Sequence, residues 1–363
     1  MIYLDYQATT PLAPEARDAM LPWLGGADSS GFANPHSAHR PGRAAAAAVE
    51  VAREQVAALM PPDGEVIFTS GATEAINLAI FGTMRRGNGG FAATTIEHAA
   101  VLDCAQILAR THAVSAIAVD GEGLLDPECD LPAGLALVAA MHVNNEIGTI
   151  QPVARLAERA HAQGALVLCD AVQGWGKLPL PQGCDMIAVS AHKLYGPKGI
   201  GALWLRDGIT LDPLIHGGGQ QGGLRSGTLS PALCAGFGVA ANLAVQCRDE
   251  DYAHAAALAA IVRETLPEWT LNGSASQRWP GNLNLRRDGL DVARLMSDLR
   301  GIAFSAGSAC ASGSGRPSHV LRAIGLDAAQ AKSSIRLGFG RYSTLDDVRE
   351  AALAIAAAAA AQV

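Results

Sequence analysis

The pattern of apolar and polar positions changes near residue 245. Before it, between about residues 65 and 205, short apolar or β-branched runs alternate with longer segments of helical periodicity. The short runs predict strands and the longer segments amphipathic helices. Because the strands are apolar at successive positions, burial on both faces is expected, as in a mostly parallel α/β sheet. The predicted strands are 66–69, 91–95, 135–141, 165–170, 186–190 and 201–205.

Helical patterns dominate the remainder of the chain. The helical runs 251–266, 291–300 and 345–360 surround two short strand patterns, 282–286 and 333–339. This composition predicts a smaller α+β domain after about residue 245. A further long helix, over about residues 231–247, is expected to join it to the larger domain.

Composition excludes several classes of protein. With 49% hydrophobic and 17% charged residues, the 363-residue chain is neither disordered nor of low complexity. Its net charge of −7, without a basic stripe, argues against direct nucleic-acid binding. Seven cysteines without a C-x-x-C pair argue against a disulfide framework and a zinc site. Without a membrane-span or secretory pattern, we expect a cytoplasmic protein.

Polar residues follow several of the predicted strands. In open α/β sheets ligands bind beyond the carboxyl ends of the strands, so these residues are candidate site residues. The segment 70–74 (S-G-A-T-E) begins a helix, whose free N–H groups favour an anion. Each feature alone has a structural alternative: a threonine-capped helix start for 70–74 and an exposed loop lysine for Lys193. The residues after the two central strands are Asp170, Gln173, Ser190, His192 and Lys193.

Together these groups predict a pyridoxal phosphate site. A helix N-terminus with Ser, Thr and His donors suits the phosphate, and Asp170 suits a cationic ring nitrogen. Lys193 suits covalent attachment. His98 also follows a strand and is placed to stack on a flat ring, although a lone histidine is more often a cap or a core residue.

A second chemical signal lies between residues 304 and 316. Cys310 lies there in a run of small residues, and the segment 305–318 is rich in Gly and Ser. The nearby Arg316 favours the thiolate form of Cys310. Arg336, on a strand pattern, suits a grip on a substrate carboxylate, with a structural ion pair as the alternative. The cysteines expected to fill apolar regions are 104, 129, 169, 184, 234 and 247.

The chain resembles the pyridoxal phosphate-dependent cysteine desulfurases of the IscS/NifS type from Tyr3 to about Tyr342. The resemblance implies a fold-type I enzyme, with a large cofactor domain (16–245) and a small domain built from both chain ends (1–15 and 246–363). It also implies a homodimer. The matching motifs are A-T-T-P (8–11), S-G-A-T-E (70–74), E-H (97–98), H-V-N-N-E-I-G (142–148), D-A-V-Q (170–173), S-A-H-K-L-Y-G-P-K-G (190–199), R-S-G-T (225–228), S-A-C (308–310) and S-S-I-R (333–336).

The resemblance also implies a role for each matching residue. Lys193 would hold the cofactor and move the Cα proton, and Cys310 would attack the sulfur of L-cysteine, giving alanine and a persulfide for a sulfur acceptor protein. Around the ring, Asp170 would pair with the nitrogen, His98 would stack and Gln173 would bind the phenolic oxygen. The phosphate would be held by Ala72, Thr73, Ser190 and His192, and Thr228 would reach the phosphate of a neighbouring subunit. The substrate carboxylate would be bound by Arg336, Asn145 and Asn34, and Asn145 would also contact the cofactor.

The sequence departs from the family pattern in two places. Gln221 and Gly222 replace a charged pair found in many relatives, and the chain lacks the C-terminal extension that docks a scaffold partner in IscS-type proteins.

Other functions remain open from the sequence. A selenocysteine lyase, an aminotransferase or a β-lyase would share the fold and cofactor, and a non-catalytic scaffold would share the fold alone. The acceptor would serve iron-sulfur cluster assembly or the synthesis of a thio-cofactor or thiolated tRNA.

Overall fold

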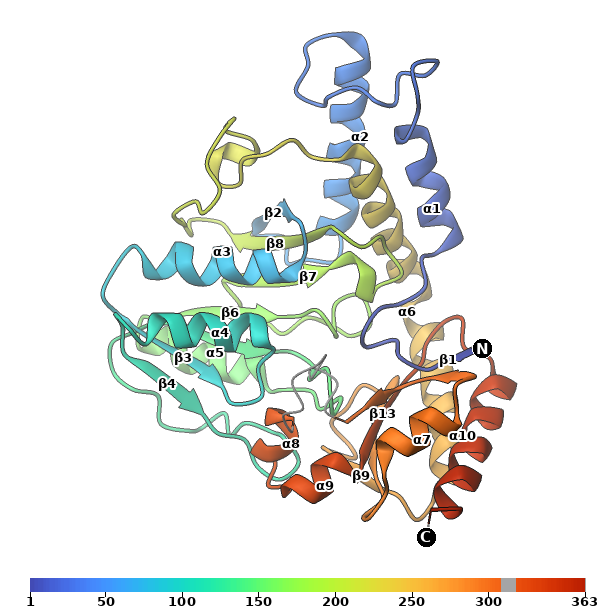
Figure 1. Cartoon of the computed structure of the whole chain (residues 1–363). Coiled ribbons are helices and arrows are strands. Elements are labelled where there is room, and N and C mark those ends of the chain that lie inside the picture. The colour runs from blue at the N-terminus through green and yellow to red at the C-terminus, as the bar shows by residue number, and fades with distance from the viewer. Residues whose placement is uncertain (308–317, 363) are drawn as a thin grey trace.

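A seven-stranded sheet forms the centre of the larger part of the molecule (Figure 1). The computed structural model describes residues 1–307 and 318–362. The strand order is β2-β8-β7-β6-β5-β3-β4. The strands are β2 (Gly64–Thr69), β3 (Gly90–Thr94), β4 (Val114–Ile117), β5 (Leu135–Met141), β6 (Leu166–Asp170), β7 (Met186–Ser190) and β8 (Gly201–Arg206).

The predicted α/β fold with a mostly parallel sheet is confirmed. Strands β4, β3, β5, β6 and β7 are parallel, and β8 is antiparallel to both of its neighbours. Strand β4 was not predicted, because its four residues, V-S-A-I, are too few to produce a pattern and three of them are partly or fully exposed.

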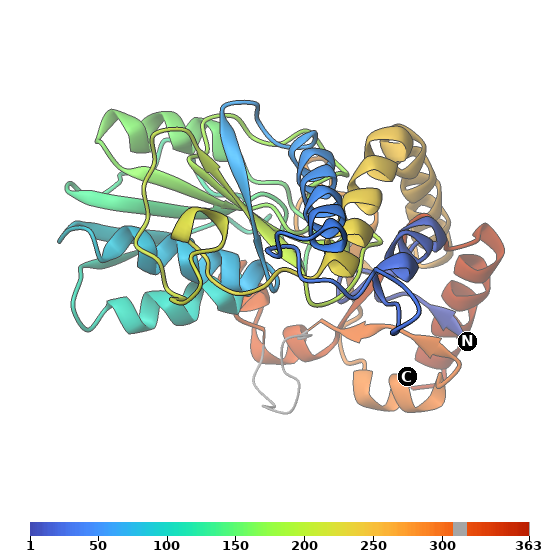
Figure 2. The ribbon, with the colours of Figure 1, turned by 90° about the horizontal axis from the view of Figure 1, so that it is seen from above.

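Helices cover both faces of this sheet (Figure 2). On one face α3 (Ala72–Met84) and α4 (Ala99–Leu108) pack against the strands in one apolar core. The opposite core contains α2 (Arg40–Ala57), α5 (Val153–Ala162) and the first half of α6 (Pro231–Thr265). Since both faces are covered, the strands carry continuous apolar runs.

A second, antiparallel sheet of order β12-β13-β10-β9 lies in the C-terminal part. It packs against the end of α6, α7 (Val292–Asp298) and α10 (Leu345–Ala360). The sequence predicted two strands here and missed three, because those have only two or three residues each. The strands of this sheet are β9 (Thr270–Asn272), β10 (Asn282–Arg286), β12 (Ser305–Ala306) and β13 (Ser334–Gly338), while β11 (Ile302–Ala303) belongs to a separate two-stranded sheet.

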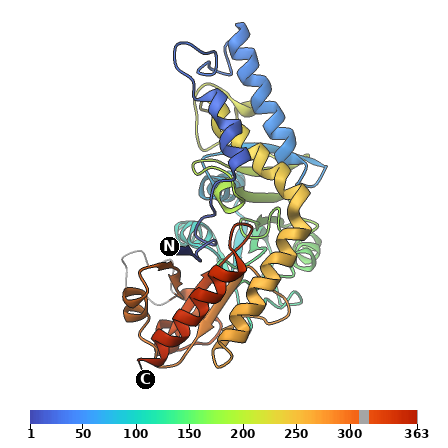
Figure 3. The ribbon, with the colours of Figure 1, turned by 90° about the vertical axis from the view of Figure 1, so that its right-hand side faces the viewer.

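The N-terminus joins this C-terminal part. Strand β1 (Ile2–Tyr3) pairs in parallel with β11, so both chain ends belong to one body. Helix α6 connects the two bodies as one helix of 35 residues (Figure 3). The sequence predicted separate helices over 231–247 and 251–266. The polar residues between them include the exposed Asp249 and Glu250, which continue the helix at the surface.

The shorter elements complete the structure. Helix α8 (His319–Ala323) packs, through Val320 and Leu321, against Ile96 and Met141 at the ends of the large sheet. None of the helices in the described part of the chain has the length and apolar character needed to span a bilayer. The other elements are α1 (Pro14–Met20), α9 (Ala328–Lys332) and the 3₁₀ turns η1 (Leu21–Trp23), η2 (Ala191–Lys193) and η3 (Gln221–Gly223).

The side chain of Gln221 occupies the free edge of the large sheet. Its Nε2 donates to the Phe68 carbonyl oxygen (2.8 Å), and its Oε1 accepts from the Phe68 N–H (2.7 Å). Gln221 therefore has an internal partner, and it satisfies backbone groups on edge strand β2.

The packing of Phe237 generates a stability prediction. Its fully buried ring lies 5.4 Å from Trp175 and 6.2 Å from Phe68, centroid to centroid. We expect Phe237→Ala to lower the free energy of unfolding by about 3–5 kcal/mol, because it leaves a cavity beneath the sheet. Denaturant unfolding measures the change. Val245→Ala on the same helix, where the side chain is 51% exposed, is the control and should change it by less than about 0.5 kcal/mol; equal effects would contradict the packing argument.

Candidate active site

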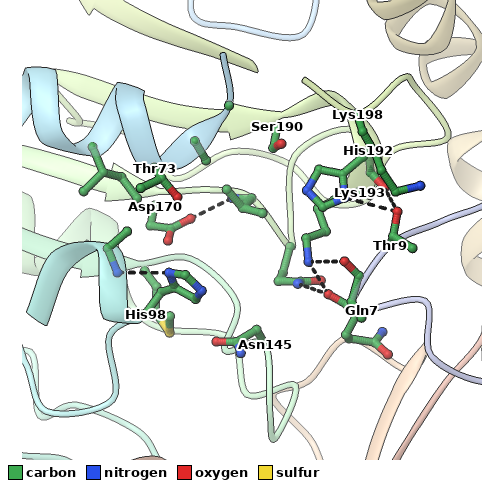
Figure 4. A pocket seen from close by; sticks show the side chains of 18 of the residues that line it. Gln7, Thr9, Thr73, His98, Asn145, Asp170, Ser190, His192, Lys193 and Lys198 are labelled. Atoms are coloured by element: carbon green, nitrogen blue, oxygen red, sulfur yellow. Dashed lines mark hydrogen bonds between the residues drawn. The ribbon is translucent and has the colours of Figure 1, made fainter. Parts of the chain in front are cut away.

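A cavity of about 630 Å³ lies where strands of the large sheet end. Strands β2, β5, β6 and β7 end at this edge, and the residues at or just after their ends line the cavity. The N-terminal segment and β13 contribute the remaining wall. The lining includes Gln7, Ala8, Thr9, Ser70–Glu74, His98, Asn145, Asp170, Gln173, Ser190, His192, Lys193, Lys198 and Arg336 (Figure 4).

Ten of the thirteen predicted site residues line this one cavity. Thr228 and Asn34 are exposed and do not line it. The Asn34 side chain accepts from the His36 N–H (2.8 Å) in a local turn. Cys310 lies outside the described residues. The ten that line it are Ala72, Thr73, His98, Asn145, Asp170, Gln173, Ser190, His192, Lys193 and Arg336.

The N-terminus of α3 opens into the cavity. Gly71 is its N-cap residue and no side chain accepts from the first N–H groups, so the threonine cap considered for this helix is wrong. Glu74 instead accepts from the Ser70 N–H (2.8 Å) and pairs with Arg225 (2.7 Å). The free N–H groups and the helix dipole therefore favour an anion such as a phosphate.

Asp170 ends β6 at the floor of the cavity. The residue is 6% exposed, and its Oδ1 accepts from the Val172 N–H (3.0 Å). Burial raises the pKa of Asp170, while His98 and Lys193 act in the opposite direction. A cationic ring nitrogen beside the carboxylate would stabilise its charged form.

His98 is both a helix cap and a wall of the cavity. It is the N-cap residue of α4, and its Nδ1 accepts from the Ala100 N–H (3.1 Å). This bond leaves Nε2 to carry the proton in the neutral ring. The capping alternative is thus observed, and it orients the imidazole toward the cavity (Figure 4).

Lys193 follows β7 in the turn η2 and contacts the N-terminal strap, residues 7–10. Its Nζ donates to the carbonyl oxygens of Gln7 and Ala8, the latter at 2.8 Å. Gln173 Nε2 donates to the same Gln7 oxygen (3.0 Å), and its Oε1 is buried with no hydrogen-bond partner among the described residues. A ligand oxygen that carries a proton would satisfy that atom.

The strap also contacts His192. Thr9 Oγ1 lies 3.2 Å from His192 Nδ1, and burial, followed by the nearby lysines, lowers the pKa of His192 to about 4. The ring is therefore neutral at pH 7 and acts toward an anion as a hydrogen-bond donor rather than as a cation. Sequence reasoning assigned no role to the strap, although the A-T-T-P motif at 8–11 marked it.

Arg336 reaches the cavity from β13 and is 3% exposed. It pairs with Asp5 (2.7 Å) and donates to the Asn145 carbonyl oxygen (3.1 Å). The ion-pair alternative is therefore present. The guanidinium also lines the cavity and its Nε has no partner among the described residues, so a substrate carboxylate remains compatible with its position.

The residues on either side of 308–317 are held beside the cavity. Ser305 Oγ donates to Asp5 Oδ1 (2.8 Å), and Ser318 Oγ donates to Glu146 Oε2. His319 Nε2 lies 2.8 Å from the Glu97 carbonyl oxygen. Asp5 pairs with Arg336, while Glu146 and Glu97 directly neighbour the lining residues Asn145 and His98, so Ser305, Ser318 and His319 lie beside the lining.

These residues fit pyridoxal phosphate. An uncapped helix N-terminus is present for the phosphate, a buried carboxylate for the ring nitrogen and a lysine for covalent attachment. The unpartnered Gln173 Oε1 lies in the same wall. Among the described residues, no group of three or more His, Cys, Asp or Glu side chains offers a metal site.

Comparison with known proteins agrees with this chemistry. Residues 2–350 match the aminotransferase class-V family model. The chain is 40% identical to the cysteine desulfurase IscS of Rickettsia bellii, over 96% of this chain and 88% of that protein. It is similar to the solved structure of a NifS-like protein (TM-score 0.88, 32% identity, 98% of each chain). It is also similar to SspA in complex with cysteine (TM-score 0.81, 35% identity, 95% of this chain and 100% of that one).

Glu97, buried beside the site, generates a prediction about pH. It accepts from the Met141 N–H (2.7 Å) and from Thr94 Oγ1 (2.5 Å), and burial raises its pKa to about 8. The folded state thus keeps a proton that the unfolded state releases, so Glu97 lowers stability as pH rises from about 4.5 to about 8. We expect the stability of Glu97→Gln relative to the parent to increase over this interval, by up to about 1.4 kcal/mol per pH unit.

Urea unfolding of both proteins at pH 5, 7 and 9 measures this difference. Glu65→Gln, at an exposed position of β2, is the control and should show a constant difference from the parent. A Glu97→Gln difference that is independent of pH would contradict the neutral state of Glu97.

Proposed function

The chain belongs to the class-V aminotransferase family, and from that premise we propose how its residues act in the desulfuration of L-cysteine. It is a pyridoxal phosphate-dependent cysteine desulfurase. The reaction converts L-cysteine and an enzyme thiol into L-alanine and an enzyme persulfide. One observation carries the assignment of roles: Lys193, Asp170 and the open N-terminus of α3 surround a single cavity.

Pyridoxal phosphate, when bound, supplies an electron sink for the electron pair left at Cα of the substrate. The N–H groups at 71–74, with Thr73, Ser190 and His192, would hold the phosphate, and Asp170 would stabilise a proton on the ring nitrogen. His98 would stack on the ring, and Gln173 would bind its phenolic oxygen. These contacts orient the reacting atoms.

Lys193 would hold the cofactor covalently, and its Nζ would carry the Cα proton of the substrate. The carbonyl oxygens of Gln7 and Ala8 accept from Nζ, and they give this amine a defined position. Arg336 and Asn145 bind the substrate carboxylate, which places Cα near Lys193.

Cys310 is the sulfur acceptor. Its thiolate attacks the substrate sulfur: the S–S bond forms, the Cβ–S bond breaks, and Cβ takes a proton to give alanine. The contacts of Ser305, Ser318 and His319 beside the cavity support this role, because they bring both flanks of the segment to the lining residues. The persulfide then passes to an acceptor protein for iron-sulfur cluster assembly or for another thiolated product.

The active enzyme is a homodimer in the cytoplasm. Thr228 and Asn34 lie outside the cavity of their own chain, which supports a role at the cavity of a second copy. Four exposed apolar side chains within residues 12–32 also favour a covered surface. Six cysteines are free among the described residues, which is typical of a reducing compartment. The four side chains are Leu12, Leu21, Leu24 and Phe32.

Replacement of Cys310 tests the proposed reaction. Cys310→Ser is expected to lower sulfide release from L-cysteine at least about 100-fold, because the acceptor thiol is lost. Mass spectrometry of the parent with L-cysteine should find one added sulfur on Cys310. Cys129→Ser, at a partly exposed cysteine, is the matched control and should keep parental activity.

Three outcomes would contradict the proposal. Undiminished sulfide release by Cys310→Ser would indicate a lyase without an acceptor cysteine. Preference for selenocysteine, with little turnover of cysteine, would indicate a selenocysteine lyase. A protein that stays colourless after incubation with pyridoxal phosphate would indicate a non-catalytic scaffold.

Replacement of Phe32 tests the homodimer. Phe32 is 66% exposed in the single chain, and Phe32→Asp is expected to reduce the molar mass measured by light scattering from that of a dimer to that of a monomer. A charge at a buried interface lacks a partner and its desolvation is costly. Leu353→Asp on α10, at a side chain 56% exposed, is the control and should leave the mass unchanged. A monomeric parent would contradict the homodimer.

A further inference from the structure

The backbone of Tyr195, two residues after Lys193, has an uncommon conformation. Its φ is +61°, and among the described residues only one other non-glycine residue, Gln221, has a positive φ. A bulky L-residue is a genuine outlier in this left-handed region. Such a conformation persists only where its surroundings enforce it, and it is often found at functional sites.

Thr10, at the end of the N-terminal strap, and Ala13 hold the backbone of Tyr195. The Tyr195 N–H donates to Thr10 Oγ1 (2.7 Å), which itself donates to the His192 carbonyl oxygen (3.0 Å). The Ala13 N–H donates to the Tyr195 carbonyl oxygen (2.9 Å). These bonds fix the backbone at His192 and at Tyr195, on either side of Lys193, against residues 10–13.

Two distant parts of the chain hold the ring of Tyr195. The Arg341 N–H donates to Tyr195 Oη (2.9 Å), and the Arg341 guanidinium lies 4.5 Å from the ring centroid. Asp251, on α6, binds this guanidinium through two contacts of 2.7 and 3.0 Å. Arg341 and Asp251 side chains are each 15% exposed, so this pairing is screened less than a surface ion pair.

The space around the ring is filled. Tyr342 lies edge-on at 5.4 Å, and a Cβ at Gly340 would stand 2.4 Å from Tyr195 Oη. Burial raises the pKa of Tyr195, so the phenol stays neutral and is not an acid or base at pH 7. A glycine would adopt the same φ without strain, as Gly199 does four residues later (φ +87°). A tyrosine here therefore indicates that the ring contacts matter.

We infer that Tyr195, Arg341 and Asp251 form a positioning clamp that sets the direction from which Lys193 enters the cavity. The clamp joins the turn after β7 to α6 and to the segment after β13. It acts through Lys193 and touches no reacting atom. The inference rests on the proposed function, in which Lys193 carries the cofactor.

The test compares holoenzymes loaded with pyridoxal phosphate. Arg341→Lys keeps the charge but loses the planar stack and the two-point contact, and Asp251→Asn removes the ion pair. Visible circular dichroism of the bound cofactor reports its orientation relative to the protein. We expect both variants to change this signal and to lower kcat about tenfold while KM stays within about twofold, because a small misplacement of a reacting group slows chemistry.

Two further variants complete the test. Asp249→Asn, two residues away on α6 with its side chain 97% exposed, makes the same change without touching the clamp and should match the parent. Asp251→Glu retains a carboxylate for Arg341 and should recover most of the kcat lost in Asp251→Asn. If Asp251→Asn does not fold, Arg341→Lys and Asp251→Glu give the comparison.

Opposite results would overturn the clamp. A parental dichroism signal and kcat in Arg341→Lys and Asp251→Asn, with only a lower melting temperature, would make these residues merely structural. If the parent itself bound no pyridoxal phosphate, the proposed function would fail instead, so the two failures are distinguishable.

Discussion

A carboxylate buried at the end of a central strand is the constraint on which the site depends. Asp170 lies in the interior because β6 is covered on both faces, and burial penalises its charge. Only nearby positive charge or hydrogen bonds make such a position favourable. His98, which follows β3, and Lys193, which follows β7, act in that direction. The parallel arrangement is what brings these three residues to one edge.

The remaining wall of the cavity comes from two segments that are far apart in the sequence. The strap at residues 7–10 supplies the carbonyl oxygens that Lys193 contacts, and β13 supplies Arg336. Strand β1, just before the strap, pairs with β11, and β13 belongs to the antiparallel sheet of the C-terminal part. The cavity is thus a junction between two bodies. Helix α6, with 35 residues, contributes buried side chains to the cores on both sides of this junction.

Several local predictions were accurate because their signals are local. Apolar runs and the turns after them located six strands of the large sheet, and Asp170 and Lys193 were recognisable from residue type and position after a strand. Two- and three-residue strands such as β9 and β12 were missed, because they exist only through pairing with β10 and β13. His98 illustrates an overlap of roles: the same imidazole caps α4 and lines the cavity.

By itself, the sequence determined the class of fold, the cofactor chemistry and ten of the residues that line the site, since periodicity and residue type are properties of short segments. Only the tertiary structure decided which distant groups meet: the strap at Lys193, Asp5 at Arg336, and Arg341 with Asp251 at Tyr195. These contacts join residues up to 331 positions apart, and no local pattern encodes them. They depend on how two bodies pack, which is a property of the whole folded chain.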